Sequence, residues 1–188
     1  MAGDAEATRR KLLDAASAEF AAYGIAGARV DRIAEAAGCN KALIYHHFTN
    51  KDGLFDAVFN EICESTVRET PLDATDLPGY AGKLFDRYEA RPEVARLATW
   101  YRLERGGDSA PLQLVLDSTK NKIAKITEAQ RNGELPSHFS PVDLLGLVTH
   151  VAVLWAANTP EYQSLAAKQS RAHRRRVVTD AVAALLAK

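Results

Sequence analysis

The sequence predicts an all-α protein with about nine helices. Apolar residues recur three and four positions apart along almost the whole chain, while the strict apolar–polar alternation of strands is nearly absent. Glycine and proline residues divide this pattern into segments that suit ordinary helices. The 188 residues are 47% hydrophobic and 26% charged, a composition typical of a globular protein with a substantial core.

The predicted helices fall into two groups separated by a loop between Pro71 and Pro78. In the first helix Leu13, Ala16, Phe20 and Tyr23 share one face, and Gly24 follows as a stop signal. The first group covers residues 8–23, 30–37, 40–47 and 52–69. The second group covers residues 79–91, 93–105, 111–132, 140–158 and 161–187.

The second and third helices have the features of a helix-turn-helix. The backbone is expected to leave the first of these two helices at Gly38 with a positive φ, which glycine tolerates. Asn40 can then cap the N-terminus of the second helix with its side-chain oxygen. Ala34 provides the small contact that two steeply crossing helices need, and Ile33 and Ile44 are expected to meet in the angle. The second helix of such a pair can enter the major groove of DNA.

The outward side chains of that second helix suit a polyanion. Lys41, Tyr45 and His46 all carry donors for phosphates or base edges, and no acidic residue lies between Gly38 and Lys51. Lys51 also opens the next helix, whose first N–H groups could hold a phosphate. His47 is expected to pack inward, beside the phenylalanine that follows it.

These residues match a known pattern, Gly24…Val30-x-x-Ile33-Ala34-x-x-Ala37-Gly38-x-Asn40-Lys41-Ala42-x-Ile44-Tyr45-x-His47-Phe48-x-x-Lys51-Asp52-x-Leu54. The segment from residue 8 to about residue 60 resembles the TetR family of bacterial transcriptional regulators. The resemblance implies a homodimer that reads a palindromic operator in double-stranded DNA, and a C-terminal domain that binds a small molecule and releases the DNA. It implies a DNA-binding domain over residues 1–52 and a ligand-binding and dimerisation domain over residues 53–188.

The sequence departs from the family pattern at three positions. Ala28 and Arg29 stand where the family commonly has hydroxyl residues, so Arg29 is expected to supply the phosphate contact instead. Leu43 replaces a frequent Thr or small residue and could contact a thymine methyl group. The residues expected to bind DNA are Arg29, Asn40, Lys41, Ala42, Leu43, Tyr45, His46 and Lys51.

The second half offers candidates for an effector site. Trp100 and Glu104 lie one helical turn apart, where an aromatic ring and a carboxylate could receive a cation, although a core tryptophan beside a surface glutamate explains them as well. The expected effector is therefore apolar or cationic. The candidate ligand-binding residues are Trp100, Tyr101, Glu104, His150 and Trp155.

The predicted helix over residues 140–158 is apolar almost all round and must be covered on more than one side. We expect it to form a four-helix dimer interface with the last helix. The basic run at residues 171–176 is expected to lie mid-helix as a solvated face with carboxylate partners. The expected interface residues are Leu147, Val151, Leu154, Val178, Val182 and Leu185.

Several function classes are disfavoured. The net charge is zero, so a polybasic nucleic-acid coat is excluded and a modest salt dependence of DNA binding is expected. The five histidines have no Cys or acid at ligand spacing, so we predict no enzyme, metal or cofactor. The acidic N-terminus and the absence of an apolar run of about 20 residues favour a cytoplasmic protein without a membrane span. An activator of the same fold, or a helical interaction module without operator binding, stays as an alternative.

Overall fold

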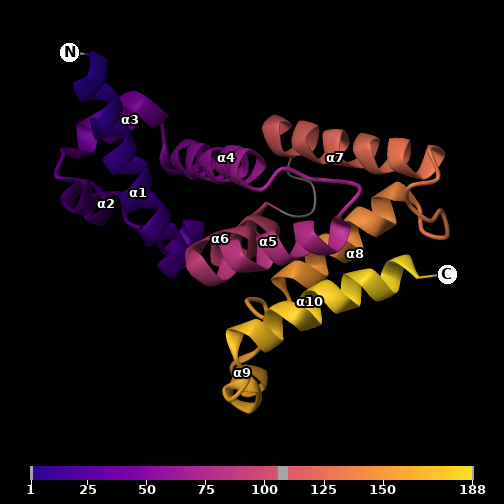
Figure 1. The fold of residues 1–188 in the computed structure, drawn as a ribbon. Coiled ribbons are helices and arrows are strands. Elements are labelled where there is room, and N and C mark those ends of the chain that lie inside the picture. Colours follow the sequence, from indigo (N-terminus) through magenta and orange to yellow (C-terminus); the bar gives the residue numbers. More distant parts are fainter. Residues whose placement is uncertain (1, 106–109, 188) are drawn as a thin grey trace. The chain divides into compact units, whose positions relative to one another are not determined.

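The computed structural model describes residues 2–105 and 110–187, which form ten helices and no strand (Figure 1). The predicted all-α class is confirmed. The helices are α1 (Ala2–Gly27), α2 (Val30–Ala37), α3 (Lys41–Phe48), α4 (Lys51–Glu69), α5 (Leu77–Ala90), α6 (Pro92–Glu104), α7 (Gln113–Arg131), α8 (Pro141–Val153), α9 (Pro160–Ala166) and α10 (Arg171–Leu186).

The prediction of a single last helix over residues 161–187 is wrong, because the chain stops and restarts inside it. Ser170 is the N-cap of α10, and its hydroxyl oxygen accepts from the backbone N–H of His173 at 3.2 Å. Thr159 caps α9 in the same way, with Pro160 in its first turn. The first N–H groups of a new helix have no carbonyl oxygen in a preceding turn, so a hydroxyl side chain at the N-cap stabilises a helix start at that point.

The chain divides into two compact units. Unit 1 comprises Met1–Ser65 and Arg96–Val115, and unit 2 comprises Thr66–Ala95 and Leu116–Lys188. Helices α4, α6 and α7 each contribute residues to both units. Unit 1 thus contains the helix-turn-helix together with the second half of α6.

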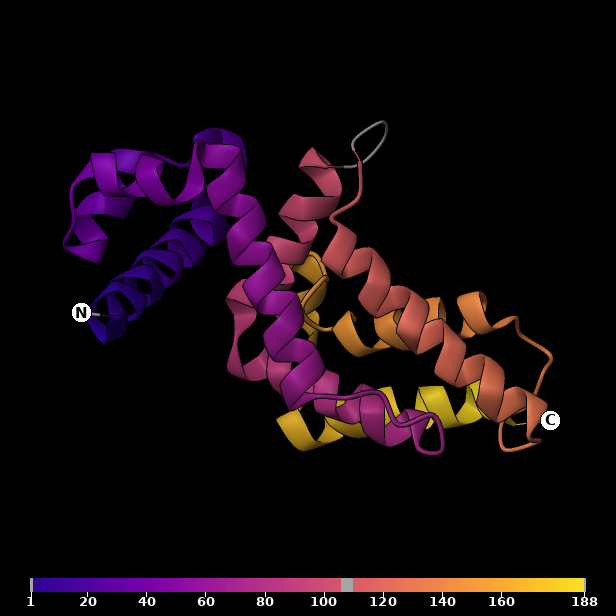
Figure 2. The same ribbon diagram turned by 90° about the horizontal axis from the view of Figure 1, so that it is seen from above.

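The core of unit 1 holds α1, α2 and α3 together, with α1 packed against α2 and α2 against α3 (Figure 2). Phe20, Ile33 and Ile44 are fully buried, and the rings of Phe20 and Phe55 meet edge to face with centroids 5.2 Å apart. Gly24, predicted as a stop signal, has the non-helical angles φ 69° and ψ −179°, so α1 consists of two helical stretches joined at a kink there. One further helical turn follows the kink.

Unit 2 is built around α5, which packs against both α8 and α10 (Figure 1). Its core contains buried aromatic and aliphatic side chains from these three helices and from α7, which contributes Ile126 and Ala129. The fully or almost fully buried members include Leu77, Tyr80, Leu84, Phe85, Leu144, Val148, Val178 and Val182. One charged side chain is buried with them, because Arg87 pairs with Glu69.

Candidate nucleic-acid interface

The turn between α2 and α3 has the conformation that its residue types predict. Gly38 adopts the left-handed conformation, with φ 67° and ψ 34°, and its N–H donates to the carbonyl of Glu35. Asn40 is the N-cap of α3, because its Oδ1 accepts from the N–H of Leu43 at 2.8 Å. The predicted capping role of Asn40 is confirmed, and both ends of the turn are held by local hydrogen bonds.

The outer face of α3 presents its polar groups to solvent. Lys41, Tyr45 and His46 are exposed, and Tyr45 keeps 43% of its surface accessible. His47 is exposed as well, so the prediction that it packs inward is wrong, although its ring lies 5.9 Å from that of Phe48. The two histidine rings meet edge to face with centroids 5.4 Å apart. The face therefore offers one more potential donor than the sequence predicted.

The predicted apolar readers of α3 differ in exposure. Ala42 is exposed and Leu43 is half-buried. A methyl or isobutyl group at the surface of a recognition helix can contact a thymine methyl group. The structure leaves both side chains partly accessible for such a contact.

The two lysines of this region already have partners within the protein. The Nζ atom of Lys41 lies 3.0 Å from Oδ1 of Asp31, and this hydrogen-bonded carboxylate raises the pKa of the lysine above its ordinary value. Lys51 donates to the carbonyl oxygens of Ala26 and Ala28, at 3.1 and 3.3 Å. Lys51 therefore fixes the connection between α1 and α2, a role that the sequence did not reveal.

The N-terminus of α2 is held from a distance by Glu19. Arg29 is its N-cap in extended conformation, without a side-chain cap, and its N–H donates to Glu19 Oε1 at 2.8 Å. The same carboxylate binds Arg32 at 2.5 Å, and the Arg32 guanidinium lies 4.3 Å from the ring centroid of Tyr23. Burial opposes ionisation of Glu19, but the hydrogen bonds and charges of Arg32 and Arg29 outweigh it and lower the pKa of the carboxyl.

The first turn of α4 carries its own cap. Asn50 Oδ1 accepts from the N–H of Gly53 at 2.8 Å. A side chain at Gly53 would place its Cβ 2.4 Å from the carbonyl oxygen of Phe48, so the turn from α3 to α4 requires glycine there. Thr49, between the two helices, has a positive φ of 64°. Because the N–H of Gly53 donates to Asn50, one of the N–H groups predicted to hold a phosphate at the start of α4 already has a partner.

The predicted effector residues on α6 contact other parts of unit 1. Glu104 Oε1 accepts from the N–H of Ile25 at 2.8 Å, directly after the kink in α1. Trp100 lies beside the same kink, because a Cβ built on Gly24 would be 2.9 Å from its ring. The ring of Tyr101 stacks on Phe59 with centroids 4.2 Å apart. The side chains of Trp100 and Glu104 thus pack beside the kink in α1, and Oε1 of Glu104 already accepts a hydrogen bond from Ile25.

The other two predicted effector residues belong to unit 2. Trp155 is 8% exposed, and its indole N–H donates to the carbonyl of Arg174 at 3.2 Å. His150 is exposed, and its Nδ1 lies 2.8 Å from the carbonyl oxygen of Gly146. The five candidates are thus divided between the two units, and each has a contact within its own unit.

The predicted dimer residues separate into two sets. Leu147 and Leu154 on and after α8 are each 37% exposed, and Val151 and Leu185 are half-buried. The other two predictions, Val178 and Val182, are wrong for this purpose, because both side chains are fully buried in the core of their own unit.

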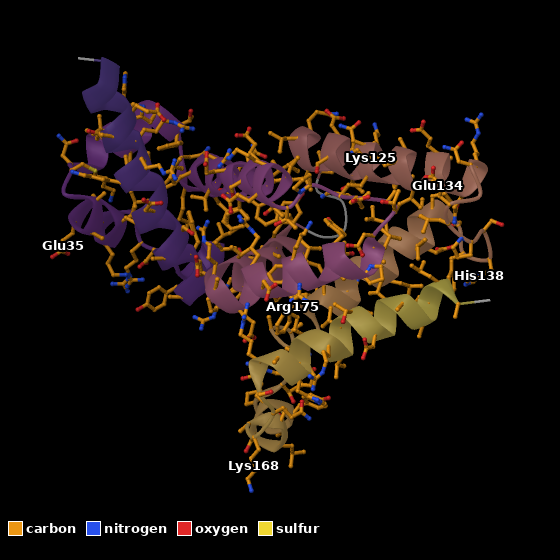
Figure 3. The ribbon with its side chains drawn as sticks, in the orientation of Figure 1. Glu35, Lys125, Glu134, His138, Lys168 and Arg175 are labelled. Carbon is orange, nitrogen blue, oxygen red and sulfur yellow. The ribbon has the colours of Figure 1, made fainter. Side chains whose placement is uncertain are left out.

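The basic run at the start of α10 is paired with acids of α5. Arg171 and Arg175 both contact Asp86, and Arg174 lies 2.7 Å from Glu89. The expected carboxylate partners are confirmed. The expected mid-helix position is wrong, since Arg171 is the first residue of α10. Figure 3 shows Arg175 on the side of α10 that faces α5.

Two family models match this chain. One, described as "Bacterial regulatory proteins, tetR family", covers residues 12–58. The other, described as "Tetracyclin repressor-like, C-terminal domain", covers residues 76–183, which is more than half of the chain. The chain belongs to the TetR family.

Similar proteins in the TetR family span nearly the whole chain. The HTH-type transcriptional repressor SCO4008 of Streptomyces coelicolor is 36% identical over 165 residues, 87% of this chain and 85% of its own. The crystal structure of SCO4942 from the same species is 42% identical, with a TM-score of 0.84 and coverage of 95% and 97%. FadR from Bacillus subtilis, solved in complex with stearoyl-CoA, shares the fold at 16% identity, with a TM-score of 0.72 and coverage of 95% and 98%.

Unit 2 of this TetR-family chain contains two cavities that none of the predicted effector residues lines. One, of about 490 Å³, is lined by Gln130, Gly133, Glu134, Leu135, Pro136, Ser137, His138 and Leu186. The other, of about 420 Å³, is lined by Leu72, Asp73, Ala74, Lys125, Glu128, Ala129, Asn132 and Glu134. Figure 3 marks Lys125, Glu134 and His138 among these residues.

Within residues 2–105 and 110–187, no helix is long and apolar enough to cross a membrane, and no three His, Cys, Asp or Glu side chains lie together in a way that could hold a metal ion.

Proposed function

We propose that this TetR-family chain is a homodimeric repressor that reads a palindromic operator through α3 and leaves it when a small molecule binds. The observation that carries the proposal is the exposed row of donors on α3, held by caps at both ends of the turn before it. A recognition helix held in this way can present its side chains to the major groove without first ordering its backbone.

On this proposal the side chains divide into base readers and phosphate contacts. Lys41 and His46 face the major groove, with Ala42 and Leu43 beside the base edges, and the hydroxyl of Tyr45 contacts a phosphate at the edge of the groove. Arg29, which is exposed, contacts a phosphate, and Lys51 contributes the one N–H that remains after its two carbonyl contacts.

The proposed dimer uses the exposed side chains of Leu147 and Leu154 and the half-buried side chains of Val151 and Leu185. Leucines that keep over a third of their surface in the single chain gain burial from a second copy. A two-fold axis through this surface matches the two-fold symmetry of a palindromic site, with half-sites about one helical turn apart.

We propose that residues 1–52 bind DNA and that residues 53–188 bind the effector and form the dimer. We also propose that the protein has no catalytic activity and acts in the cytoplasm. The effector is proposed to be a small apolar or cationic molecule. A cationic effector is less well supported than an apolar one, because Oε1 of Glu104 already accepts a hydrogen bond from the N–H of Ile25. Repression rather than activation is favoured by the name of the SCO4008 relative.

The test is a selection of binding sites from random DNA duplexes with the purified full chain. We expect enrichment of one palindromic sequence, which then binds in a gel shift. Failure to enrich any sequence would favour a helical interaction module instead. Placing the enriched site over a reporter promoter separates the remaining two functions, since a repressor lowers expression and an activator raises it.

A further inference from the structure

The surface around α3 contains one acid that the proposed function does not use. Asp31 lies in the first turn of α2, and its two carboxylate oxygens lie 3.0 and 3.1 Å from Nζ of Lys41. Both side chains are exposed, at 74% for Asp31 and 46% for Lys41. The carboxylate therefore stands on the same solvent-facing surface as the donors of α3.

Two cationic side chains of this region other than Lys41 are bound to other groups. Arg32, the next residue, is taken by Glu19 of α1, and Lys51 is held by backbone carbonyl oxygens. The start of α2 is thus also held by contacts that do not involve Asp31. An exposed pair of this kind adds little to folding stability, so its effect is to be sought in what the ammonium can bind.

A lysine ammonium is a point charge with three donors on a flexible stem, and by itself it binds any phosphate within reach. Two carboxylate oxygens at about 3 Å fix its position and leave at least one N–H directed elsewhere. They also repel phosphates. A lysine held in this way is suited to acceptors on a base edge, such as O6 and N7 of guanine, which are neutral.

We propose that Asp31 is a positioning residue for operator recognition, which directs the Lys41 ammonium to a guanine and away from phosphates. This inference rests on the proposed function. It implies that the carboxylate strengthens binding to the operator and weakens binding to other DNA. If Asp31 served folding, its substitution would lower the affinities for the operator and for other DNA alike. If only its negative charge mattered, the substitution would raise both affinities. Only a positioning role predicts that the two affinities change in opposite directions.

The experiment compares wild type with Asp31→Asn on two duplexes, the selected palindrome and a scrambled duplex of equal length and composition. Fluorescence anisotropy gives both dissociation constants over a range of salt concentrations. We expect the palindrome to bind about tenfold more weakly, as for loss of one good base contact. The scrambled duplex should bind about threefold more tightly, with a salt slope steeper by about one, because a lysine is released to the phosphates.

Three control variants isolate the effect of the Asp31–Lys41 pair. Glu35→Gln removes the same charge one turn further along α2, at an exposed side chain that Figure 3 shows at the outer edge of the helix, and should shift both affinities slightly upward. In a Lys41→Met background, Asp31→Asn should no longer weaken the palindrome. Asp31→Glu should restore part of the operator affinity, and thermal unfolding confirms that each variant is folded.

The outcomes are distinct. Opposite shifts that vanish without Lys41 support the proposal. Parallel shifts, no shift, or an effect that persists in Lys41→Met would overturn it while leaving the operator function intact. If wild-type protein distinguishes no duplex from its scramble, the proposed function itself fails, and this inference with it.

Discussion

The kink in α1 provides a sharp test of how unit 1 is held together. Gly24 has φ 69° and ψ −179°, a region of backbone conformation that is essentially restricted to glycine, and forcing another residue into it costs about 1–3 kcal/mol. A Cβ at this position would also lie 2.8 Å from Glu104 Oε1 and 2.9 Å from Cε3 of Trp100. Gly24→Ala must therefore strain the backbone and displace the side chains of Glu104 and Trp100 on α6.

The second effect breaks a specific contact. The Glu104 carboxylate accepts from the N–H of Ile25, and a hydrogen bond to a charged group is worth about 1.5–3 kcal/mol. Together with the strain, this predicts that Gly24→Ala lowers the free energy of unfolding by about 4 kcal/mol. The matched control is Gly38→Ala, since Gly38 also has a positive φ of 67° but no atom within 4 Å of the built Cβ. There we expect a loss of about 1 kcal/mol.

The assay is urea unfolding followed by circular dichroism at one fixed protein concentration, because dimerisation couples stability to concentration. A double-mutant cycle with Glu104→Ala sharpens it: part of the cost of Gly24→Ala should disappear when the carboxylate is absent. The reasoning is refuted if Gly24→Ala costs no more than Gly38→Ala.

Three further predictions concern other contacts. Gly82→Leu should lower the free energy of unfolding by about 2 kcal/mol in urea, because a Cβ there already lies 2.7 Å from Arg175 on α10; an unchanged midpoint would contradict this. The pKa of Glu19 is lowered, so its contribution to stability is present above the ordinary value of 4.5 and lost as pH falls through the lower folded pKa. Wild type should therefore lose more stability than Glu19→Gln between about pH 5 and 3 in thermal scans, and parallel curves would exclude it. Leu147→Glu should give a monomer by light scattering, whereas an intact dimer would place the interface elsewhere.

Local structure could be predicted from the sequence wherever one residue type carries the signal. The left-handed Gly38 and the Asn40 cap act within a few residues, so the turn before α3 was predicted with its hydrogen bonds. The cap at Ser170 gave a comparable signal, but the helical pattern on both sides of it concealed the break. A helix cap can thus be predicted from the sequence when the apolar pattern of the neighbouring residues also indicates a break between helices.

Contacts between helices could not be predicted in the same way. Glu19 reaches Arg29 and Arg32 from α1, and no pattern in the sequence links residues of separate helices. Glu104 was interpreted as part of an effector site, although it caps the kink in α1. Val178 was assigned to the dimer because it is apolar, but apolar character does not distinguish a core from an interface. Packing decides these roles.

The central claim is that the outer face of α3 reads the operator, and one titration tests it most directly. The selected palindrome is titrated with wild type, Tyr45→Ala and Tyr162→Ala; the two tyrosines are similarly exposed, at 43% and 45%, but Tyr162 belongs to α9 in unit 2. We predict that Tyr45→Ala weakens binding about tenfold, as expected for a contact of 1–3 kcal/mol, while Tyr162→Ala binds like wild type. Equal affinities for Tyr45→Ala and wild type, with both proteins folded, would contradict the account.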